Sequence, residues 1–186
     1  CNVMYKRAEY QKIKSRLEED RKFIQVVMGA RQIGKSTVVK QVLKDISLPF
    51  HFFSADNVPA TNTAWISNCW AAVRSLKENN GWSSIILVID EIQKITNWSE
   101  VVKKEWDDDT FHNCNIKVLL LGSSRVLLEK GLSESLAGRT KPYIRLLAPR
   151  LMSLSSSFDG GFVKKQTATA TQATTAAMMI QNAGFL

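Results

Sequence analysis

Short apolar runs alternate with amphipathic segments along the first 150 residues. The runs are strand-length and cover 23–28, 50–53, 85–89, 116–121 and 143–147. The run at 85–89 is continuous and rich in β-branched residues, which is typical of a parallel strand covered on both faces. Between the runs, apolar residues recur at helical spacing, as at Trp65, Cys69, Val73 and Leu76. This alternation predicts an α/β fold with a parallel sheet.

Helical patterns are expected over 5–21, 38–44, 63–81, 101–106 and 126–138. After Arg150 the composition shifts, with four serines at 153–157 and a segment of mostly Thr, Ala and Gln at 166–177. Such a segment has too few large apolar side chains to offset its ordering entropy. We therefore predict an N-terminal helix (1–22), a core (23–150) and a poorly ordered low-complexity tail (151–186) without site residues.

Composition narrows the function classes. Apolar residues make up 45% and charged residues 23% of the 186 residues, as in ordinary globular proteins, and the net charge is +8. This charge leaves nucleic acid open as a partner, but no nucleic-acid-binding motif is present, and a solvated basic surface is the simpler interpretation. No apolar run is long enough to span a membrane, so a cytoplasmic protein without a membrane partner is expected.

Metal ligation by clustered side chains is not expected. The three cysteines and two histidines share no metal-ligand spacing, and the cysteines are interpreted as reduced thiols. Asp107, Asp108 and Asp109 are consecutive, and consecutive side chains on a helix do not converge. We interpret them as a solvated turn after the helix at 101–106.

The segment directly after the first apolar run carries the clearest chemistry. It reads GARQIGKST and fits G-x-x-x-x-G-K-[ST], the phosphate-binding P-loop. Gly29 and Gly34 are expected to allow backbone conformations that turn N–H groups toward a phosphate. Lys35 is expected to reach the β- and γ-phosphates, and Ser36 to ligate Mg²⁺. The predicted nucleotide-binding residues are Gly29, Ala30, Arg31, Gln32, Ile33, Gly34, Lys35, Ser36 and Thr37.

An acidic pair, Asp90 and Glu91, ends the apolar run at 85–89. Alone it is equally consistent with a solvent-facing strand end. After a P-loop it predicts a Walker B motif, because ligands of open α/β sheets bind at the carboxyl ends of the strands. Asp90 would then join Ser36 at Mg²⁺, and Glu91 would be the general base that polarises the attacking water.

Two further segments have alternatives that the sequence leaves open. Ser123 and Ser124 end the run at 116–121, where a hydroxyl is expected either to contact the γ-phosphate or attacking water or to form only a polar turn. Arg139 precedes the last apolar run. It is expected either to lie on the surface or to reach the nucleotide of a neighbouring subunit, where a guanidinium neutralises developing charge.

These stretches together resemble a prokaryotic group of AAA+ ATPases that usually carries a C-terminal domain of unknown function. The similarity spans about 6–147 and rests on GARQIGKST, LVIDEIQKITNWSEVVKK and LLLGSSRVLLEKGLSESLAGR. It implies a three-layer α-β-α P-loop NTPase fold with a parallel five-stranded sheet in the order 5-1-4-3-2. It also implies ATP with Mg²⁺, Ser123 or Ser124 as sensor 1, and Arg139 as an arginine finger.

Departures from the group are also visible. Ala30 stands where the group usually has proline, a position that supplies only backbone. The chain beyond Leu147 does not resemble the expected continuation, so we expect a fragment or a frameshifted end.

The leading functional hypothesis is an Mg²⁺-dependent ATPase that releases ADP and phosphate. The alternative is a nucleotide-switched interaction module that binds ATP without significant turnover, and phosphate release separates the two. A GTPase is disfavoured, because no N-K-x-D motif is present. A homo-oligomer stays open as a partner hypothesis, since Arg139 acting in trans requires a second copy.

Overall fold

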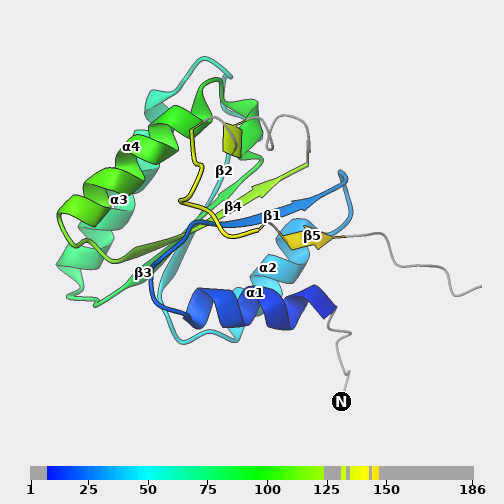
Figure 1. Cartoon of the computed structure of the whole chain (residues 1–186), viewed down its shortest axis with the longest axis horizontal. Coiled ribbons are helices and arrows are strands. Elements are labelled where there is room, and N and C mark those ends of the chain that lie inside the picture. Colours follow the sequence, from blue (N-terminus) through cyan, green and yellow to red (C-terminus); the bar gives the residue numbers. More distant parts are fainter. Residues whose placement is uncertain (1–7, 124–130, 133–134, 143, 147–186) are drawn as a thin grey trace, which may run out of the picture. The chain divides into compact units, whose positions relative to one another are not determined.

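A computed structural model of the chain describes residues 8–123, 131–132, 135–142 and 144–146 (Figure 1). Helices and strands alternate as the apolar pattern predicts. In chain order they are α1 (Ala8–Glu18), β1 (Gln25–Gly29), α2 (Lys35–Lys44), β2 (Phe50–Ser54), α3 (Ala64–Asn79), β3 (Ile85–Asp90), the 3-10 turn η1 (Ile92–Lys94), α4 (Trp98–Phe111), β4 (Ile116–Gly122) and β5 (Ile144–Leu146).

The five strands form one parallel sheet in the order β2-β3-β4-β1-β5. Read from the other edge, this is the predicted order 5-1-4-3-2, which is therefore confirmed. Strand β1 lies between β4 and β5, and it pairs with β4 through Val27 and Leu121 and with β5 through Val27 and Ile144. Because all strands are parallel, the carboxyl ends of β1, β3 and β4 lie at the same end of the sheet.

Helices cover both faces of the sheet, which makes the predicted three layers (Figure 1). On β3, Leu87 faces the α3 and α4 side, whereas Ile86 and Val88 face the α1 and α2 side. All of β3 is buried, as expected for a strand covered on both faces. Burial of apolar area on both faces is the main stabilising contribution to this fold.

Helix α1 belongs to the same core as the sheet. Tyr10, Ile13 and Leu17 recur at helical spacing and are buried against α2 and β5 residues. Along the opposite face of α1 the side chains are mostly charged or polar and at least partly exposed. The amphipathic pattern predicted at 5–21 therefore places this helix over one face of the sheet.

The acidic run at 107–109 is not the solvated turn that the sequence pattern suggested. Helix α4 continues to Phe111, and Asp109 is only 1% exposed. Its carboxylate accepts hydrogen bonds from Trp70 Nε1 at 2.9 Å and Arg74 Nε at 2.7 Å, which join α3 to α4. Burial raises the pKa of Asp109, while the bonds from Arg74 and Trp70 act in the opposite direction. The interpretation failed because helical phase turns Asp109 inward and Asp108 outward.

Several predictions fall on residues that the structure does not describe. Ser124, most of the helix expected at 126–138 and the whole tail at 151–186 lie outside the described residues. The domain boundaries at 22 and 150 stay predictions. Within the described part of the chain, every helix is too short or too polar to cross a membrane.

Candidate nucleotide site

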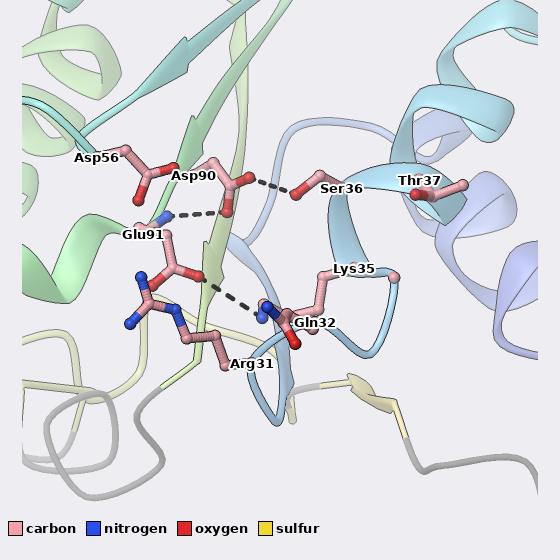
Figure 2. Close-up of a pocket in the computed structure, with 9 residues that line it drawn as sticks. Arg31, Gln32, Lys35, Ser36, Thr37, Asp56, Asp90 and Glu91 are labelled. Carbon is pink, nitrogen blue, oxygen red and sulfur yellow. Dashed lines mark hydrogen bonds and ion pairs between the residues drawn. The ribbon is translucent and has the colours of Figure 1, made fainter.

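The loop between β1 and α2 wraps around the start of the helix (Figure 2). Gly34 takes a left-handed conformation with φ of 88°, which favours glycine, and α2 begins at the next residue. Gln32 also has a positive φ, 61°, although it carries a side chain. The amino end of α2 is therefore directed at the loop, where its dipole favours an anion.

Gly29 serves the loop differently from the expectation. Its backbone is part of β1 and has no positive φ, so left-handed freedom is not what the position requires. A Cβ atom there would lie 3.0 Å from Ile33 Cγ2 and 3.0 Å from the Leu146 carbonyl oxygen. Glycine is therefore needed for the close approach of the loop and β5 to the end of β1.

Lys35 is the first residue of α2 and is only 5% exposed. Its ammonium Nζ lies 3.2 Å from the Ala30 carbonyl oxygen and 3.6 Å from Glu91 Oε1. A buried ammonium is costly unless charge or hydrogen bonds compensate it, and here both partners come from the site itself. The cation is thus held between the loop and the end of β3.

Ser36 and Asp90 are in direct contact. The Ser36 hydroxyl donates a hydrogen bond to Asp90 Oδ2 (Figure 2). The other oxygen, Asp90 Oδ1, accepts the backbone N–H of Glu91 at 2.9 Å. The structure therefore brings together the two residues that the sequence assigned to Mg²⁺, one from α2 and one from β3.

The residues present fit a magnesium ion with a bound phosphate. Mg²⁺ prefers oxygen ligands and is usually held by one or two carboxylates together with substrate phosphates. Ser36 and Asp90 supply a hydroxyl and a carboxylate beside the anion-binding loop. Among the described residues no three His, Cys, Asp or Glu side chains gather into a cluster that could hold a metal alone. This donor set suits an ion that takes its remaining ligands from nucleotide and water.

Glu91 follows β3 in a left-handed conformation with φ of 54°. Such a backbone is uncommon for a residue with a side chain, and residues of this kind concentrate at functional sites. Its Oε2 accepts hydrogen bonds from Ser123 Oγ and Gln93 Nε2, each at 2.7 Å. Its Oε1 faces Lys35. Both carboxylate oxygens are therefore oriented by named groups.

A pocket of about 330 Å³ lies above this cluster. Its lining is Arg31, Gln32, Gly34, Lys35, Ser36, Thr37, Asp56, Asp90 and Glu91 (Figure 2). Eight of these nine residues belong to the predicted nucleotide, metal or base positions, and the ninth is Asp56. Three predicted nucleotide-binding residues, Gly29, Ala30 and Ile33, do not line the pocket. Ala30 contributes its carbonyl oxygen to Lys35, and Ile33 packs against the core.

Two residues of the site were missed by sequence analysis. Asp56 lines the pocket just after β2, and Lys94 Nζ lies 2.5 Å from its Oδ1. This hydrogen bond from Lys94 lowers the pKa of Asp56. Gln93 contacts both Glu91 and Ser123. The signal for Asp56 was available, because it follows the carboxyl end of a predicted strand.

Arg139 lies away from the pocket of its own chain. Its carbonyl oxygen accepts the N–H of Ile24 at 2.8 Å, at the amino end of β1. That end and Gly29 are roughly 16 Å apart along the strand. The Arg139 guanidinium forms a two-pronged pair with Asp107, at 2.7 and 2.9 Å, which raises its pKa. A role for Arg139 in catalysis therefore requires the nucleotide of another subunit.

The sequence is similar to one known family over most of its length. A family described as an AAA domain has a model that matches residues 21–150. An uncharacterized protein of Methanocaldococcus jannaschii is 28% identical over 147 residues, which cover 74% of this chain. The match covers 30% of that relative, so the chain spans less than a third of its length.

Two solved structures share the fold. The Walker-type ATPase of Pyrococcus abyssi superposes with a TM-score of 0.56 at 16% identity, covering 77% of this chain and 53% of that one. The Orc1 protein of Aeropyrum pernix in complex with DNA gives a TM-score of 0.54 at 12% identity, covering 78% and 46%. At these identities the similarity shows the fold alone, an α/β fold with a five-stranded parallel sheet.

Proposed function

The chain belongs to the AAA-domain family whose model spans residues 21–150, and from this premise we propose that it binds ATP with Mg²⁺ and hydrolyses it to ADP and phosphate. One observation carries the proposal. Lys35, Ser36, Asp90 and Glu91, from α2 and the end of β3, converge on a single pocket beside the loop at 29–37. Phosphoryl transfer to water depends on positioning and charge neutralisation, which these groups can supply.

Binding would begin with Lys35. Its ammonium is buried, and its partners are a carbonyl oxygen and Glu91, both of which a phosphate can replace as an acceptor. The loop and the amino end of α2 favour the same anion. Phosphate would thus draw Lys35 away from Glu91 and anchor the β- and γ-phosphates.

Ser36 and Asp90 would hold Mg²⁺. The ion, when bound, neutralises charge on the phosphate oxygens. The Ser36 hydroxyl donates a hydrogen bond to Asp90, so the two oxygen groups lie close together. The second Asp90 oxygen is fixed by the Glu91 N–H, which orients the carboxylate.

Glu91 is proposed as the general base. Its Oε2 accepts two hydrogen bonds, whereas Oε1 faces Lys35 and the pocket. Once phosphate holds Lys35, Oε1 is the oxygen that can take the proton from an attacking water. Ser123, at the carboxyl end of β4, is proposed to keep this carboxylate in place.

A second copy of the chain would supply the remaining cation. Arg139 is paired with Asp107 and lies near the amino end of β1, whereas the pocket of its own chain lies at the carboxyl ends of the strands. It is partly exposed, as an arginine that reaches a neighbouring subunit must be. Ser124, the homo-oligomer, nucleic acid binding and a cytoplasmic location stay predictions.

Phosphate release tests the proposal. The wild type should release phosphate from ATP when Mg²⁺ is present, and Glu91→Gln should lower the rate about 100-fold or more, because a general base contributes at least that much. ATP binding by Glu91→Gln, measured by calorimetry, should persist. Turnover by this variant at the wild-type rate would remove Glu91 as the base. Tight ATP binding without phosphate release by the wild type would favour the nucleotide-switched module instead.

A further inference from the structure

Gln93 connects the ends of two strands at the pocket. It lies in η1, the short turn that follows β3, and is 9% exposed. Its Nε2 donates to Glu91 Oε2 at 2.7 Å and to Ser123 Oγ at 3.2 Å. Ser123 Oγ in turn donates to the same Glu91 oxygen at 2.7 Å. The three side chains therefore form a closed triangle of hydrogen bonds across β3 and β4.

The amide of Gln93 has one orientation that suits this triangle. Reversal would place its carbonyl oxygen against the Glu91 carboxylate, and two acceptors repel each other. In the observed orientation, Gln93 Oε1 is buried without a hydrogen-bond partner among the described residues. A buried polar atom without a partner is unfavourable, and an apolar side chain would avoid it. The advantage of glutamine over an apolar side chain at this position is therefore the hydrogen bonds that its amide nitrogen donates.

Gln25 provides an internal comparison. It too is buried, at 6% exposed, and its Oε1 also lacks a partner among the described residues. Its Nε2 donates instead to the Phe23 carbonyl oxygen at 3.2 Å, at the amino end of β1. Both glutamines are therefore buried and polar. They differ in the acceptor of the amide N–H, which is a backbone carbonyl for Gln25 and the side chains of Glu91 and Ser123 for Gln93.

The hydrogen-bond triangle gives the two Glu91 carboxylate oxygens different partners. Oε2 is occupied by Gln93 and Ser123, which leaves Oε1 toward Lys35 and the pocket. The backbone of Glu91 has a φ of 54°, so the side chain leaves the strand end in an uncommon direction and depends on neighbours for its orientation. A base held within a fraction of an ångström of its productive position needs such support.

We infer that Gln93 is a positioning residue for Glu91: its amide holds Oε2 so that Oε1 points at the attacking water. The inference rests on the proposed function, because it concerns the base of that reaction. Gln93 touches neither nucleotide nor metal in this account and acts only through Glu91. Its removal should therefore change the rate of the chemical step and leave nucleotide binding unchanged.

The test is a double-mutant cycle in the full chain. Gln93→Met keeps the length of the side chain and removes the amide, and it should lower kcat about tenfold or more with the dissociation constant for Mg·ATP within twofold of wild type. In the Glu91→Gln background, the same substitution should cause no further loss, because the group that it positions is gone. Gln25→Met is the matched control and should leave kcat within twofold.

The outcomes separate the inference from the proposed function. A wild type that binds Mg·ATP without releasing phosphate overturns the proposed function, and the inference with it. An active wild type with Gln93→Met within twofold of its kcat overturns the inference alone. An equal loss in both Glu91 backgrounds also overturns it, since Gln93 would then act on the fold. Gln93→Asn keeps the amide but shortens its reach, and it should lose as much kcat as Gln93→Met, with a melting temperature near that of wild type.

Discussion

Lys35 Nζ lies 3.6 Å from Glu91 Oε1, with both side chains largely removed from water. The pair joins the residue proposed to bind phosphate to the residue proposed as the base. Each partner reduces the cost of burying the other's charge. Phosphate and Glu91 are both acceptors for the same ammonium, so nucleotide binding and release of the base should be coupled.

Glu91→Gln should therefore bind ATP more tightly than the wild type. The substitution removes the competing carboxylate from Lys35 and a negative charge from the face that meets the phosphates. We expect the dissociation constant for Mg·ATP to fall about fivefold, equivalent to about 1 kcal/mol. Calorimetric titration measures it directly, and an unchanged or larger constant would show that Lys35 and Glu91 do not compete.

Asp56→Asn is the matched control for that experiment. Asp56 lines the same pocket and carries the same charge, but its partner is Lys94 rather than Lys35. Removing it tests the effect of charge alone, and we expect a smaller change in the dissociation constant than for Glu91→Gln. Equal changes in the two variants would assign the effect to general electrostatics.

The effect of metal removal on ATP binding should show that Ser36 acts through the metal, unlike Lys35. In Ser36→Ala, the hydroxyl that contacts Asp90 is lost while the ammonium remains. Addition of EDTA should weaken ATP binding by the wild type markedly and by Ser36→Ala only slightly, because that variant lacks a proposed metal ligand. Titrations with and without EDTA measure the difference. An equal EDTA effect in the two proteins would mean that Ser36 does not contribute to metal binding.

The parallel sheet and the loop after its first strand could be predicted because their signals are local, whereas the strand order came from the family resemblance. The apolar runs at 85–89 and 116–121 mark buried parallel strands, and the glycines and lysine of GARQIGKST follow the first run at the spacing of a P-loop. Asp90 and Ser36 could be placed together by one rule, that ligands gather at the carboxyl ends of parallel strands. The observed hydrogen bond between them joins residues 54 positions apart.

The contacts of Gln93 and Asp109 could not be predicted, because residue spacing does not show which way these side chains point in the folded chain. Gln93 reaches Glu91 only because Glu91 adopts a left-handed backbone and η1 turns back over it. Asp109 is buried because α4 continues through the acidic run and Trp70 and Arg74 on α3 lie opposite. Both contacts arise from tertiary packing, which decides the burial of polar residues independently of the local pattern.

Two adjacent carboxylates between α3 and α4, Asp108 and Asp109, should contribute differently to the stability of the fold. Asp109→Ala removes a fully buried partner of Trp70 and Arg74, and should lower the free energy of unfolding by about 2 kcal/mol. Asp108→Ala removes an Arg74 partner that is half exposed, and should cost less than about 0.5 kcal/mol. Urea unfolding measures both. Similar losses in the two variants would contradict the asymmetry.

Cys69 should contribute to the pH dependence of stability. Burial raises the pKa of its thiol to about 12. In the folded state the thiol thus keeps its proton through a range in which the unfolded chain loses it, so stability should fall as pH rises from about 8.5 toward 12. Between pH 8 and 10, the wild type should lose about 2 kcal/mol more than Cys69→Ala. Parallel pH profiles from urea unfolding would contradict a buried thiol.

The most direct test of ATP binding at the site is the change in melting temperature on adding Mg·ATP to the wild type and to Lys35→Ala. At about one hundred times the dissociation constant, binding adds about 2.7 kcal/mol to the free energy of unfolding, enough to raise the midpoint by several degrees. A nucleotide site built on Lys35 predicts this rise in the wild type and none in Lys35→Ala, and the melt of the variant without nucleotide shows whether it is folded. No rise in either protein, or an equal rise in both, would contradict a nucleotide site built on Lys35.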